Sequence, residues 1–501
     1  MTETDIIIIG AGLAGVSAAH AADEKGARTL IVDRGAIGIG NNSTMAGGWF
    51  AAPTSSYSAE EYIKDTMAIG QRLNNKRLVE TIAREAPEAF RRLSSLGFSL
   101  EETAEHFVYR PQKNQILTCL TMMSTIKKRL ESRENIETLS GFYVTDILKR
   151  SNRVIGVKGF DRIGNERSLT AESVILATGG GGGLYSRTDN HRNALGQGHY
   201  LAAKAGLELQ DMEFVQFYPV IANEAHLPPL CLSPPQGAVL INSAGDDVLK
   251  NQNITEGLEE ASMKKRDELS RIVFRESRSG PVYMDCRAIA AAMANESMAT
   301  LKKLKFNLEK RPVEITAGAH FFMGGVPVNE RAETNLPGLF ACGEVACGLH
   351  GANRRGGNAL TECLVFGRIA GQTAAENAGK NRAAAAVKSD CISISAARNE
   401  ISEEKNDLRE LPKKKMKALS DGLKNIAWNK IGVIRNEKLL KAAVVELKDV
   451  EERIKTIQPE NKRKMVQKED LKASVFILRS IATASLKRRK NIGAFYRSDL
   501  S

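Results

Sequence analysis

Apolar residues gather in four short runs that lie far apart in the chain. The runs are "DIIIIG" at 5–10, "TLIVD" at 29–33, "ESVILATGG" at 172–180 and "GLFACGEV" at 338–345. Short apolar runs bounded by glycine or acidic residues are typical of parallel strands that are buried on both faces. The pattern predicts an α/β fold in which distant segments of the chain contribute strands.

A different pattern covers the last part of the chain. Over 419–457, apolar residues recur at helical spacing on a charged background. This periodicity predicts amphipathic helices. A polar, alanine-rich stretch at 376–390, "ENAGKNRAAAAVKSD", precedes them and is typical of a connector. We therefore expect a separate helical C-terminal domain.

A glycine motif follows the first apolar run. Gly10, Gly12 and Gly15 form a G-x-G-x-x-G turn between the first strand and a predicted helix. In such turns the first glycine permits the tight turn, the second lets a pyrophosphate approach the backbone, and the third allows close helix–strand packing. The N-terminus of the helix offers N–H donors to the phosphates. Asp33, at the end of the second strand, lies where an acidic residue binds adenosine ribose hydroxyls.

The segments after Asp33 favour FAD over NAD as the dinucleotide. A long loop rich in glycine, serine and asparagine follows at 34–53, in place of an immediate third helix. Two strands far downstream end in "ATGG" and "GE", as a chain needs when it wraps a long cofactor in an extended pose. We expect the flavin end of the cofactor to lie near 338–360.

Length and cysteine content narrow the class of protein. The chain has 501 residues, too many for one core, and seven cysteines without any C-x-x-C pair. The cysteines argue against a disulfide framework, an iron–sulfur cluster or a zinc site within the chain, and we expect no bound metal. No run approaches the roughly 18 apolar residues of a membrane span, and "MTETDIIIIG" has no basic leader, so we expect a cytoplasmic protein.

The net charge of +12 is concentrated near the C-terminus. From Cys391 onward, 26 Lys and Arg residues face 15 Asp and Glu residues. A solvated helical surface explains such an excess. The functional alternative is a docking face for an acidic electron-transfer partner or a field for an anionic substrate. Nucleic acid is a poor candidate, because the chain has no recognisable nucleic-acid module and only 5% aromatic residues.

Nearly the whole chain resembles the flavoprotein subunits of succinate dehydrogenase and fumarate reductase, with L-aspartate oxidase and the adenylylsulfate reductase flavoprotein as relatives. The segments that carry the resemblance are "DIIIIGAGLAG", "NSTMAGGWF", "ILATGGGGGLY", "GQGHYLAAKAGLELQDMEFVQFYP", "KKRDELSRIVFRE", "AHFFMGGVPVN", "GLFACGEVACGLHGANRRGGNALTECLVFGR", "WNKIGVIRNEKLL" and "GAFYRSD". The resemblance implies a glutathione-reductase-type FAD-binding domain with an inserted α+β capping domain and a helical C-terminal domain. The implied boundaries are 1–216 and 330–388 for the two parts of the FAD-binding domain, 217–329 for the capping domain and 389–501 for the helical domain.

The resemblance also implies hydride transfer between the flavin N5 and a carbon next to a carboxylate. Arg266, with Asp267 beside it, matches the family's proton-transferring arginine. Such an arginine must be held next to carboxylates, because a guanidinium is otherwise never deprotonated. His320 matches a substrate-binding histidine, and Arg354 matches the arginine that grips a substrate carboxylate with two hydrogen bonds.

Further residues match the family's cofactor site. Glu344 matches the acid that binds the ribityl chain, and His350 would support the flavin edge. Asn358 and Leu360 begin a predicted helix whose N-terminus would stabilise negative charge on the reduced flavin. The full expected cofactor-binding set is Gly10, Gly12, Gly15, Asp33, Ser43, Thr44, Gly47, Gly48, Thr178, Gly179, Gly180, Asp211, Glu344, Asn358 and Leu360.

Two departures from the family pattern change the expectation. Family members attach FAD covalently through a histidine in the loop after Asp33, but Asn41 and Asn42 occupy that region here, so we expect non-covalent FAD. A second substrate-binding histidine is replaced by Tyr218, and a Thr-Glu pair by Leu230 and Cys231. The missing residues hold the far carboxylate of a dicarboxylate, and an unpaired carboxylate buried there would cost several kcal/mol.

Three functions remain open from the sequence. The first is an FAD-dependent oxidoreductase of the fumarate reductase type, acting on a C–C or C–N bond next to a carboxylate. Its substrate need not be fumarate or succinate, and a monocarboxylate or a larger enoate with an apolar tail fits the changed residues. The second is an electron-transfer flavin subunit of an iron–sulfur complex without fumarate chemistry of its own. The third is an L-aspartate-oxidase-like enzyme. In each case we expect a separate electron carrier, iron–sulfur subunit or oxygen to exchange electrons, and contact with a membrane only through partner subunits.

Overall fold

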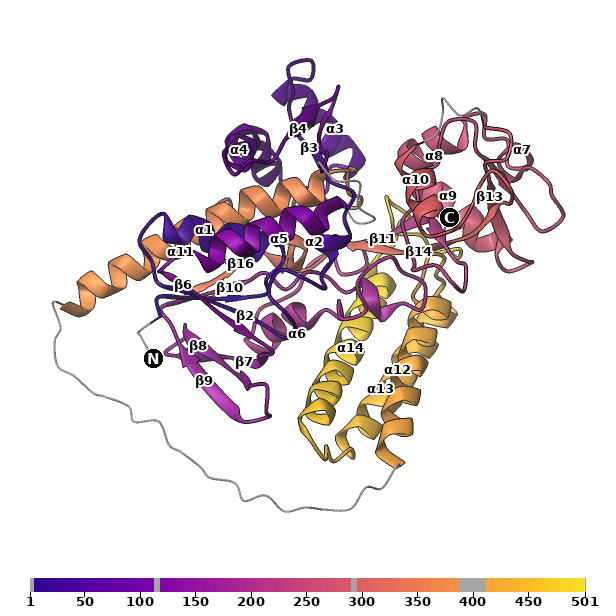
Figure 1. Cartoon of the computed structure of the whole chain (residues 1–501). Helices are drawn as coiled ribbons and strands as arrows, with labels where there is room; N and C mark the ends of the chain where they lie inside the picture. Colours follow the sequence, from indigo (N-terminus) through magenta and orange to yellow (C-terminus); the bar gives the residue numbers. More distant parts are fainter. Residues whose placement is uncertain (1–3, 112–117, 290–294, 387–410, 501) are drawn as a thin grey trace.

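A five-stranded parallel sheet lies at the centre of the N-terminal part of the molecule (Figure 1). The computed structural model of the chain describes residues 4–111, 118–289, 295–386 and 411–500. The strand order is β16-β10-β1-β2-β6. These strands are β1 (Ile6–Ile9), β2 (Thr29–Asp33), β6 (Ile136–Ser140), β10 (Ser173–Leu176) and β16 (Leu339–Ala341). The four apolar runs of the sequence therefore meet in one sheet.

Alternate residues of β1 enter two different cores. Ile6 and Ile8 pack with helices α1, α5 and α11 on one face of the sheet, while Ile7 and Ile9 pack with a small antiparallel sheet, β7-β8-β9, on the other. Figure 1 shows the helices above the central sheet and the small sheet below it. Because β1 is buried on both faces, its sequence is wholly apolar rather than alternating. The bounds are α1 (Leu13–Asp23), α5 (Thr118–Glu131), α11 (Asn358–Ala386), β7 (Tyr143–Arg150), β8 (Arg153–Phe160) and β9 (Glu166–Thr170).

The segments between the strands of the central sheet form the rest of this domain. A second small sheet, β3-β5-β4, and two helices lie between β2 and α5 along the chain, and a short helix follows β10. The bounds are α2 (Asn42–Met45), β3 (Trp49–Ala51), α3 (Ala59–Ile69), α4 (Lys76–Ser95), β4 (Leu100–Glu102), β5 (His106–Tyr109), η1 (Gly182–Leu184) and α6 (Gln197–Lys204).

A four-stranded antiparallel sheet of order β11-β14-β13-β12 forms the base of the capping region. Helix α9 packs against β11 and β14, so its first residue, Arg266, is held beside these two strands. The bounds are β11 (Val215–Ala222), β12 (Val239–Ile241), α7 (Val248–Asn251), α8 (Leu258–Lys264), α9 (Arg266–Glu276), β13 (Val282–Asp285), α10 (Glu296–Lys303) and β14 (Val313–Phe322). Short elements β15 (Val326–Pro327), η3 (Gly343–Val345) and β17 (Ala346–Cys347) lead back to the first domain.

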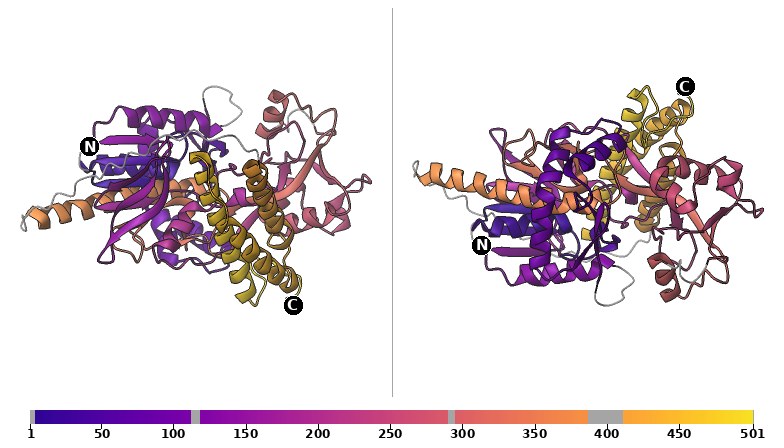
Figure 2. Two further views of the ribbon diagram at one scale, coloured as in Figure 1. Left: turned by 90° about the horizontal axis from the view of Figure 1, so that it is seen from below. Right: turned by 90° about the horizontal axis from the view of Figure 1, so that it is seen from above.

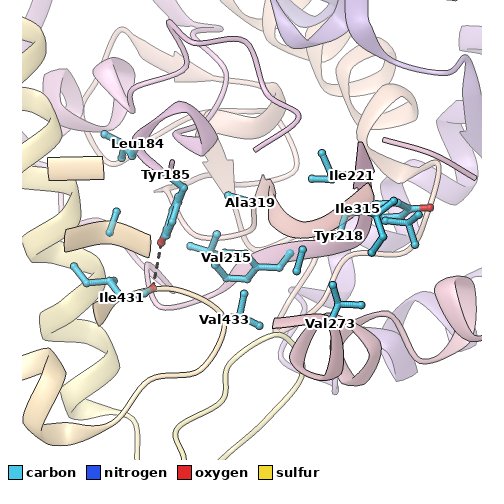
Figure 3. Packing of buried hydrophobic residues seen from close by; sticks show 14 of the residues in the cluster. Leu184, Tyr185, Val215, Tyr218, Ile221, Val273, Ile315, Ala319, Ile431 and Val433 are labelled. Atoms are coloured by element: carbon cyan, nitrogen blue, oxygen red, sulfur yellow. Dashed lines mark hydrogen bonds between the residues drawn. The ribbon is translucent and has the colours of Figure 1, made fainter. Parts of the chain in front are cut away.

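Three C-terminal helices, α12 (Leu411–Lys430), α13 (Glu437–Lys455) and α14 (Lys462–Lys487), lie beneath the junction of the two sheets (Figure 1 and Figure 2). They share one continuous core with the capping sheet, in which Val215 of β11 lies near Val433, which follows α12 (Figure 3). The hydroxyl of Tyr185 donates to the carbonyl of Ile431 at 3.4 Å. The helical part therefore supports both domains rather than standing apart.

The predicted connector is helical where the structure describes it. Helix α11 continues through Ala386, so residues 376–386 are its last turns, and 387–390 lie outside the described residues. The expected domain boundaries at 216/217, 329/330 and 388/389 stay predictions. No helix in the described ranges combines the length and the apolar character needed to cross a bilayer.

Candidate active site

A cavity of about 1440 Å³ lies where the carboxyl ends of β1, β2 and β10 face the capping sheet, and we call it the central cavity. One end is lined by Gly12, Asp33 and Thr178 from the central sheet. The other end is lined by His320 of β14 and Arg266 of α9. Ligands of open α/β sheets bind outside the carboxyl ends of the strands, so the position is that of a cofactor site with a substrate site beyond it.

The glycines of the first turn do what their spacing predicts. Gly10 has φ +106°, and a Cβ there would lie 2.3 Å from the carbonyl oxygen of Ala177. A Cβ on Gly15 would lie 2.0 Å from the carbonyl oxygen of Gly10, so only glycine allows α1 to pack this closely on the turn. Gly12 is the N-cap of α1 and has no side chain to cap the helix. The first turn of α1 therefore presents its backbone to the cavity, as a pyrophosphate requires.

Asp33 closes this end of the central cavity. Its carboxylate accepts hydrogen bonds from the backbone N–H of Ala11 at 2.9 Å and of Gly35 at 2.7 Å. Burial nevertheless raises the pKa of Asp33, and the backbone donors and Arg34 oppose that shift. The carboxylate is thus held rigidly at the end of β2 while it faces the cavity, where ribose hydroxyls could donate to it.

Several buried polar atoms on the cavity wall have no partner within the described residues. They include Thr178 Oγ1 and Asn41 Nδ2. Buried polar groups are normally hydrogen-bonded, so these atoms indicate a bound polar molecule. Gly179 has φ +71° and open space where a Cβ would lie. The donors and the open backbone fit the long polar chain of FAD.

Glu344 lies at the middle of the central cavity. It accepts a hydrogen bond from the N–H of Phe322 at 3.0 Å and one from Asn42 Nδ2 at 3.4 Å. Gly180 makes room for it, because a Cβ at that position would lie 2.1 Å from Glu344 Oε1. Burial raises the pKa of Glu344 to about 7. Near neutral pH the Glu344 carboxyl group is therefore partly protonated, so it can donate as well as accept a hydrogen bond.

Arg266, His320 and Arg354 come together at the far end of the central cavity, although they belong to α9, β14 and the loop before α11. Arg354 is only 6% exposed, and its guanidinium lies 4.6 Å from the ring centroid of Phe321. Burial lowers the pKa of Arg354 to about 10, and the positive charge of Arg266 adds to that effect. The Nε atoms of both arginines are buried and lack a partner among the described residues. The arrangement suits a negatively charged ligand.

The carboxylate expected beside Arg266 is engaged elsewhere. Asp267 accepts a hydrogen bond from Asn353, and burial raises its pKa to about 6. Arg266 instead lies over the ring of Tyr218, with 5.4 Å between its guanidinium carbon and the ring centroid. Asp267 lies close enough to Arg266 for their charges to interact, but its side chain turns to the loop that carries Arg354, and the proton-transfer role of Arg266 stays a prediction.

The three positions that depart from the family pattern all line the same end of the cavity. Tyr218 is buried, and its hydroxyl donates to the carbonyl of Leu232 at 3.1 Å. Its ring centroid lies 5.4 Å from that of His320. Cys231 lines the cavity, and desolvation together with the nearby charge of Asp189 raises the pKa of its thiol, so it stays neutral. This wall offers little to a second carboxylate.

The sequence analysis missed Asp189. Its Oδ2 lies 2.6 Å from Nδ1 of His320, and both residues line the central cavity. The only signal in the sequence was the polar run "RTDNHRN" before α6. Asp189, Cys231 and His320 bring donor atoms within 4.8 Å of one another, but Arg266 and Arg354 face the same space. Two guanidinium charges oppose a bound cation, and we assign no metal to this group.

The expected cofactor residues divide into two groups. Those that line the central cavity are Gly12, Asp33, Ser43, Gly47, Thr178, Gly179, Glu344 and Leu360. Those that do not line it are Gly10, Gly15, Thr44, Gly48, Gly180, Asp211 and Asn358. Asp211 lies 3.9 Å from Arg488 near the C-terminus, and Asn358 accepts a hydrogen bond from Tyr62 at 2.9 Å. His350 lies behind Phe321 and forms a buried pair with Glu362 at 3.0 Å.

The fold and the cavity define a flavoprotein that binds FAD. A family model described as an FAD binding domain matches residues 5–360, and one described as the fumarate reductase flavoprotein C-terminal domain matches residues 420–501. The chain belongs to the fumarate reductase and succinate dehydrogenase flavoprotein family of FAD-dependent oxidoreductases. The family, the α/β fold with a helical C-terminal domain and the FAD cofactor predicted from the sequence are thereby confirmed.

Several relatives cover most of this chain. An uncharacterized FAD-dependent oxidoreductase of Methanocaldococcus jannaschii is 31% identical over 99% of this chain and 94% of its own. A subunit of the fumarate reductase (CoM/CoB) of Methanothermobacter marburgensis is 29% identical over the same shares. An L-aspartate oxidase of Bacillus subtilis is 30% identical over 74% of this chain and 72% of its own.

Solved structures share the fold. The FrdA chain of the E. coli quinol fumarate reductase superposes with a TM-score of 0.84 at 24% identity, over 99% of this chain and 91% of that chain. Mycobacterium smegmatis Sdh1, solved in complex with UQ1, superposes with a TM-score of 0.82 at 25% identity, over 99% of this chain and 89% of that chain.

Proposed function

We propose that the protein transfers hydrogen to or from a C–C bond next to a carboxylate. The observation that carries this proposal is the pair of arginines, Arg266 and Arg354, at one end of the central cavity with unpartnered buried Nε atoms. Neither arginine forms an ion pair with another described residue. Arg354 is buried and Arg266 is partly buried, and two like charges held there without an ion-pair partner are costly. A substrate carboxylate would supply the missing negative charge.

Each residue has a distinct role in the proposed reaction. Arg354 holds the substrate carboxylate with two hydrogen bonds, and its packing on Phe321 fixes the plane of the guanidinium. Arg266 gives a proton to the carbon adjacent to the reacting carbon, or takes one from it. His320 orients the same carboxylate from β14. Bound FAD would supply the hydride transfer.

The substrate class follows from the wall beside the arginines. Tyr218, Leu230 and Cys231 stand where a dicarboxylate site would need charged or polar donors. Leu232 and Met263 extend this wall with apolar surface. An enoate with one carboxylate and an apolar tail would bury that surface, whereas a second carboxylate would lack a partner there. We therefore propose a monocarboxylate enoate rather than fumarate.

FAD is proposed to be non-covalent. Asn42 is held by Asn190 at 2.8 Å and by the N–H of His191 at 2.8 Å, so it serves as a structural link in this loop. His106 and His191 also line the central cavity and are the histidines to check. After denaturation and ultrafiltration, all flavin should pass into the filtrate. Flavin retained on a peptide that contains either histidine would contradict this part of the proposal.

Electrons are proposed to arrive from a separate protein. The sequence has no cysteine motif for an iron–sulfur cluster. The relative from Methanothermobacter marburgensis is named as one subunit of its enzyme, which supports a partner protein for this chain as well.

An anaerobic half-reaction tests the proposed chemistry. The purified holoprotein is reduced with a stoichiometric amount of dithionite, and flavin reoxidation is followed by its visible absorbance after addition of fumarate, crotonate or longer enoates. Fast reoxidation by monocarboxylate enoates is expected. Turnover of fumarate with a micromolar KM would overturn the proposed substrate class. No reoxidation by any enoate, with flavin still bound, would favour an electron-transfer subunit. Flavin reduction by L-aspartate would favour an oxidase.

A matched pair of variants on helix α9 assigns the proton transfer. Arg266→Gln should slow reoxidation by at least about 100-fold, the usual contribution of a positioned acid or base. Arg275→Gln removes an exposed arginine from the same helix and should leave the rate unchanged. Equal rates in the two variants would remove Arg266 from the mechanism.

A further inference from the structure

Asp189, which is buried, and His320, whose side chain is 24% exposed, form a hydrogen-bonded pair on the wall of the central cavity. The distance from Asp189 Oδ2 to His320 Nδ1 is 2.6 Å, which is short for a hydrogen bond to nitrogen. The side chain of Asp189 is 6% exposed. Within the described part of the chain, Nε2 of His320 makes no hydrogen bond. The ring therefore has one nitrogen held by a carboxylate and one left for a ligand.

The backbone around Asp189 is fixed to the strand that carries His320. Thr188 Oγ1 donates to the carbonyl of Ala319 at 2.7 Å. Asn190 Nδ2 donates to the carbonyl of His320 at 2.8 Å and to Asp189 Oδ1 at 3.1 Å. These bonds join the loop to β14 on both sides of the Asp189–His320 contact. The carboxylate thus has little freedom to move away from the imidazole.

The charged groups around His320 shift its pKa in opposite directions. Burial lowers the pKa of His320, Asp189 raises it, and the two arginines lower it further. The ionisable and charged groups that face the ring come from five elements or loops and are Asp189, Tyr218, Cys231, Arg266 and Arg354. Asp189 is the one group among them that favours a positive ring at neutral pH.

We propose that Asp189 is a positioning residue that fixes His320 with its Nδ1–H bound to the carboxylate and its Nε2 directed at the substrate. The inference rests on the proposed function. In the neutral ring that Asp189 selects, Nε2 carries a lone pair and cannot donate to a carboxylate. Binding of a carboxylate at Nε2 therefore requires that the ring takes up a proton from solvent, and Asp189 stabilises the resulting imidazolium. Carboxylate binding is coupled to uptake of one proton.

The first test reads His320 directly in the oxidised holoprotein. Histidines are labelled with 15N and 13C, and the signal of His320 among the seven histidines is assigned with His320→Gln. The wild type should show a strongly deshielded Nδ1 proton. Asp189→Ala should lose that proton signal and give a mixture of tautomers, whereas Asp285→Asn, which alters a carboxylate paired with Arg287 at the end of β13, should not. An unchanged tautomer in Asp189→Ala would overturn the proposal.

The second test follows binding of crotonate by the perturbation of flavin absorbance as pH is varied. In the wild type the dissociation constant should rise as the pH is raised above the pKa of His320 in the free protein, and it should level off above the pKa of His320 in the complex. In Asp189→Asn the same rise should begin about one pH unit lower, and binding near neutral pH should be about tenfold weaker, because the charge partner is lost. Identical pH profiles in the two proteins would contradict the coupling.

The two tests separate the inference from the function on which it rests. If crotonate and the other enoates fail to bind the wild type, the proposed substrate class fails, while the histidine spectra still decide whether Asp189 holds His320. If crotonate binds with a pH profile that Asp189→Asn leaves unchanged, the function stands and the role of Asp189 is wrong.

Discussion

Arg354 and Arg355 are adjacent on one loop, but their side chains have different partners. These partners indicate that Arg355 stabilises the fold and that Arg354 binds a ligand. The guanidinium of Arg355 bonds to Tyr57 and to Glu105 at 2.7 Å, and it stacks over the Tyr57 ring at 4.8 Å. Arg354 has no carboxylate partner among the described residues and faces the central cavity. A satisfied buried arginine stabilises the fold, whereas an unsatisfied one beside a cavity indicates a ligand.

The two arginines give a matched prediction. Arg354→Lys keeps the charge but loses the two-pronged geometry, so KM for the enoate substrate should rise about tenfold or more. Arg355→Lys should leave KM unchanged and lower the Tm, because the stacking and the buried hydrogen bonds are lost. Steady-state kinetics and thermal unfolding of both variants check this. A rise in KM in Arg355→Lys alone would reverse the assignment.

Glu344 gives a prediction on pH dependence. Its pKa is raised to about 7 in the folded chain and is near the ordinary 4.5 when unfolded. The folded state therefore holds the extra proton between these values, so the apoprotein loses stability from this group as pH rises from 4.5 towards 7. In thermal unfolding of the apoproteins, Glu344→Gln should gain Tm relative to the wild type on going from about pH 5 to about pH 8. A constant difference would show that Glu344 titrates normally.

At the scale of elements, close contact between α1 and β1 depends on a single missing side chain. The Cβ of any other residue at Gly15 would clash with the backbone of Gly10. This clash involves backbone atoms, so the movement of a flexible side chain cannot relieve it. The helix N-terminus would move away from the turn that faces the cofactor. The cost of such overpacking is typically about 1–3 kcal/mol.

Gly15→Ala should therefore release FAD. The expected result is a lower ratio of flavin to protein absorbance after purification, with weaker rebinding of added FAD. Gly422→Ala is the control, because a Cβ in this part of α12 has open space around it. The control should keep its FAD and gain about 0.5–1 kcal/mol of helix stability. Full FAD occupancy in Gly15→Ala would refute the packing argument.

At the scale of the whole molecule, the C-terminal helices are tied to the cofactor domain beside Asp33. Arg34 donates two hydrogen bonds to Asp470 of α14, at 2.8 and 2.7 Å. The Tyr143 hydroxyl donates to the same carboxylate at 2.9 Å. Since Arg34 directly follows Asp33, α14 helps to hold the end of β2 in place. The helical part therefore contributes to the cofactor site without touching it.

Asp470→Asn should weaken the contact that Arg34 and Tyr143 make with α14. Loss of a charged, largely buried hydrogen-bonding partner is expected to cost about 2 kcal/mol, seen as a lower Tm and weaker FAD retention. Lys441→Gln breaks an exposed pair with Glu437 on α13 and should cost less than about 1 kcal/mol. Equal effects of the two substitutions would mean that the Arg34–Asp470 contact adds no more stability than an exposed ion pair.

The sequence by itself determined the sheet, the cofactor turn and the helical character of the C-terminal part. These features depend on local patterns: a wholly apolar strand such as β1, glycines at fixed spacing, and apolar residues at helical spacing. It also determined that Arg266, His320 and Arg354 are candidates, through several motifs in one order. Even so, residues 376–386 of the predicted connector belong to α11, because an alanine-rich polar segment continues a helix that is already nucleated.

Only the tertiary structure decided how the site is arranged. Asp189 was missed because its contact with His320 joins two segments 131 residues apart, and a polar loop residue carries no mark of its partner. Asp267 is next to Arg266 in sequence, yet its side chain accepts a hydrogen bond from Asn353, because successive helix residues point in different directions. Asp211 does not line the central cavity and lies 3.9 Å from Arg488, so its expected role at the cofactor stays a prediction. Which polar groups are paired and which face a cavity depends on long-range packing, and this decided where the anion site lies.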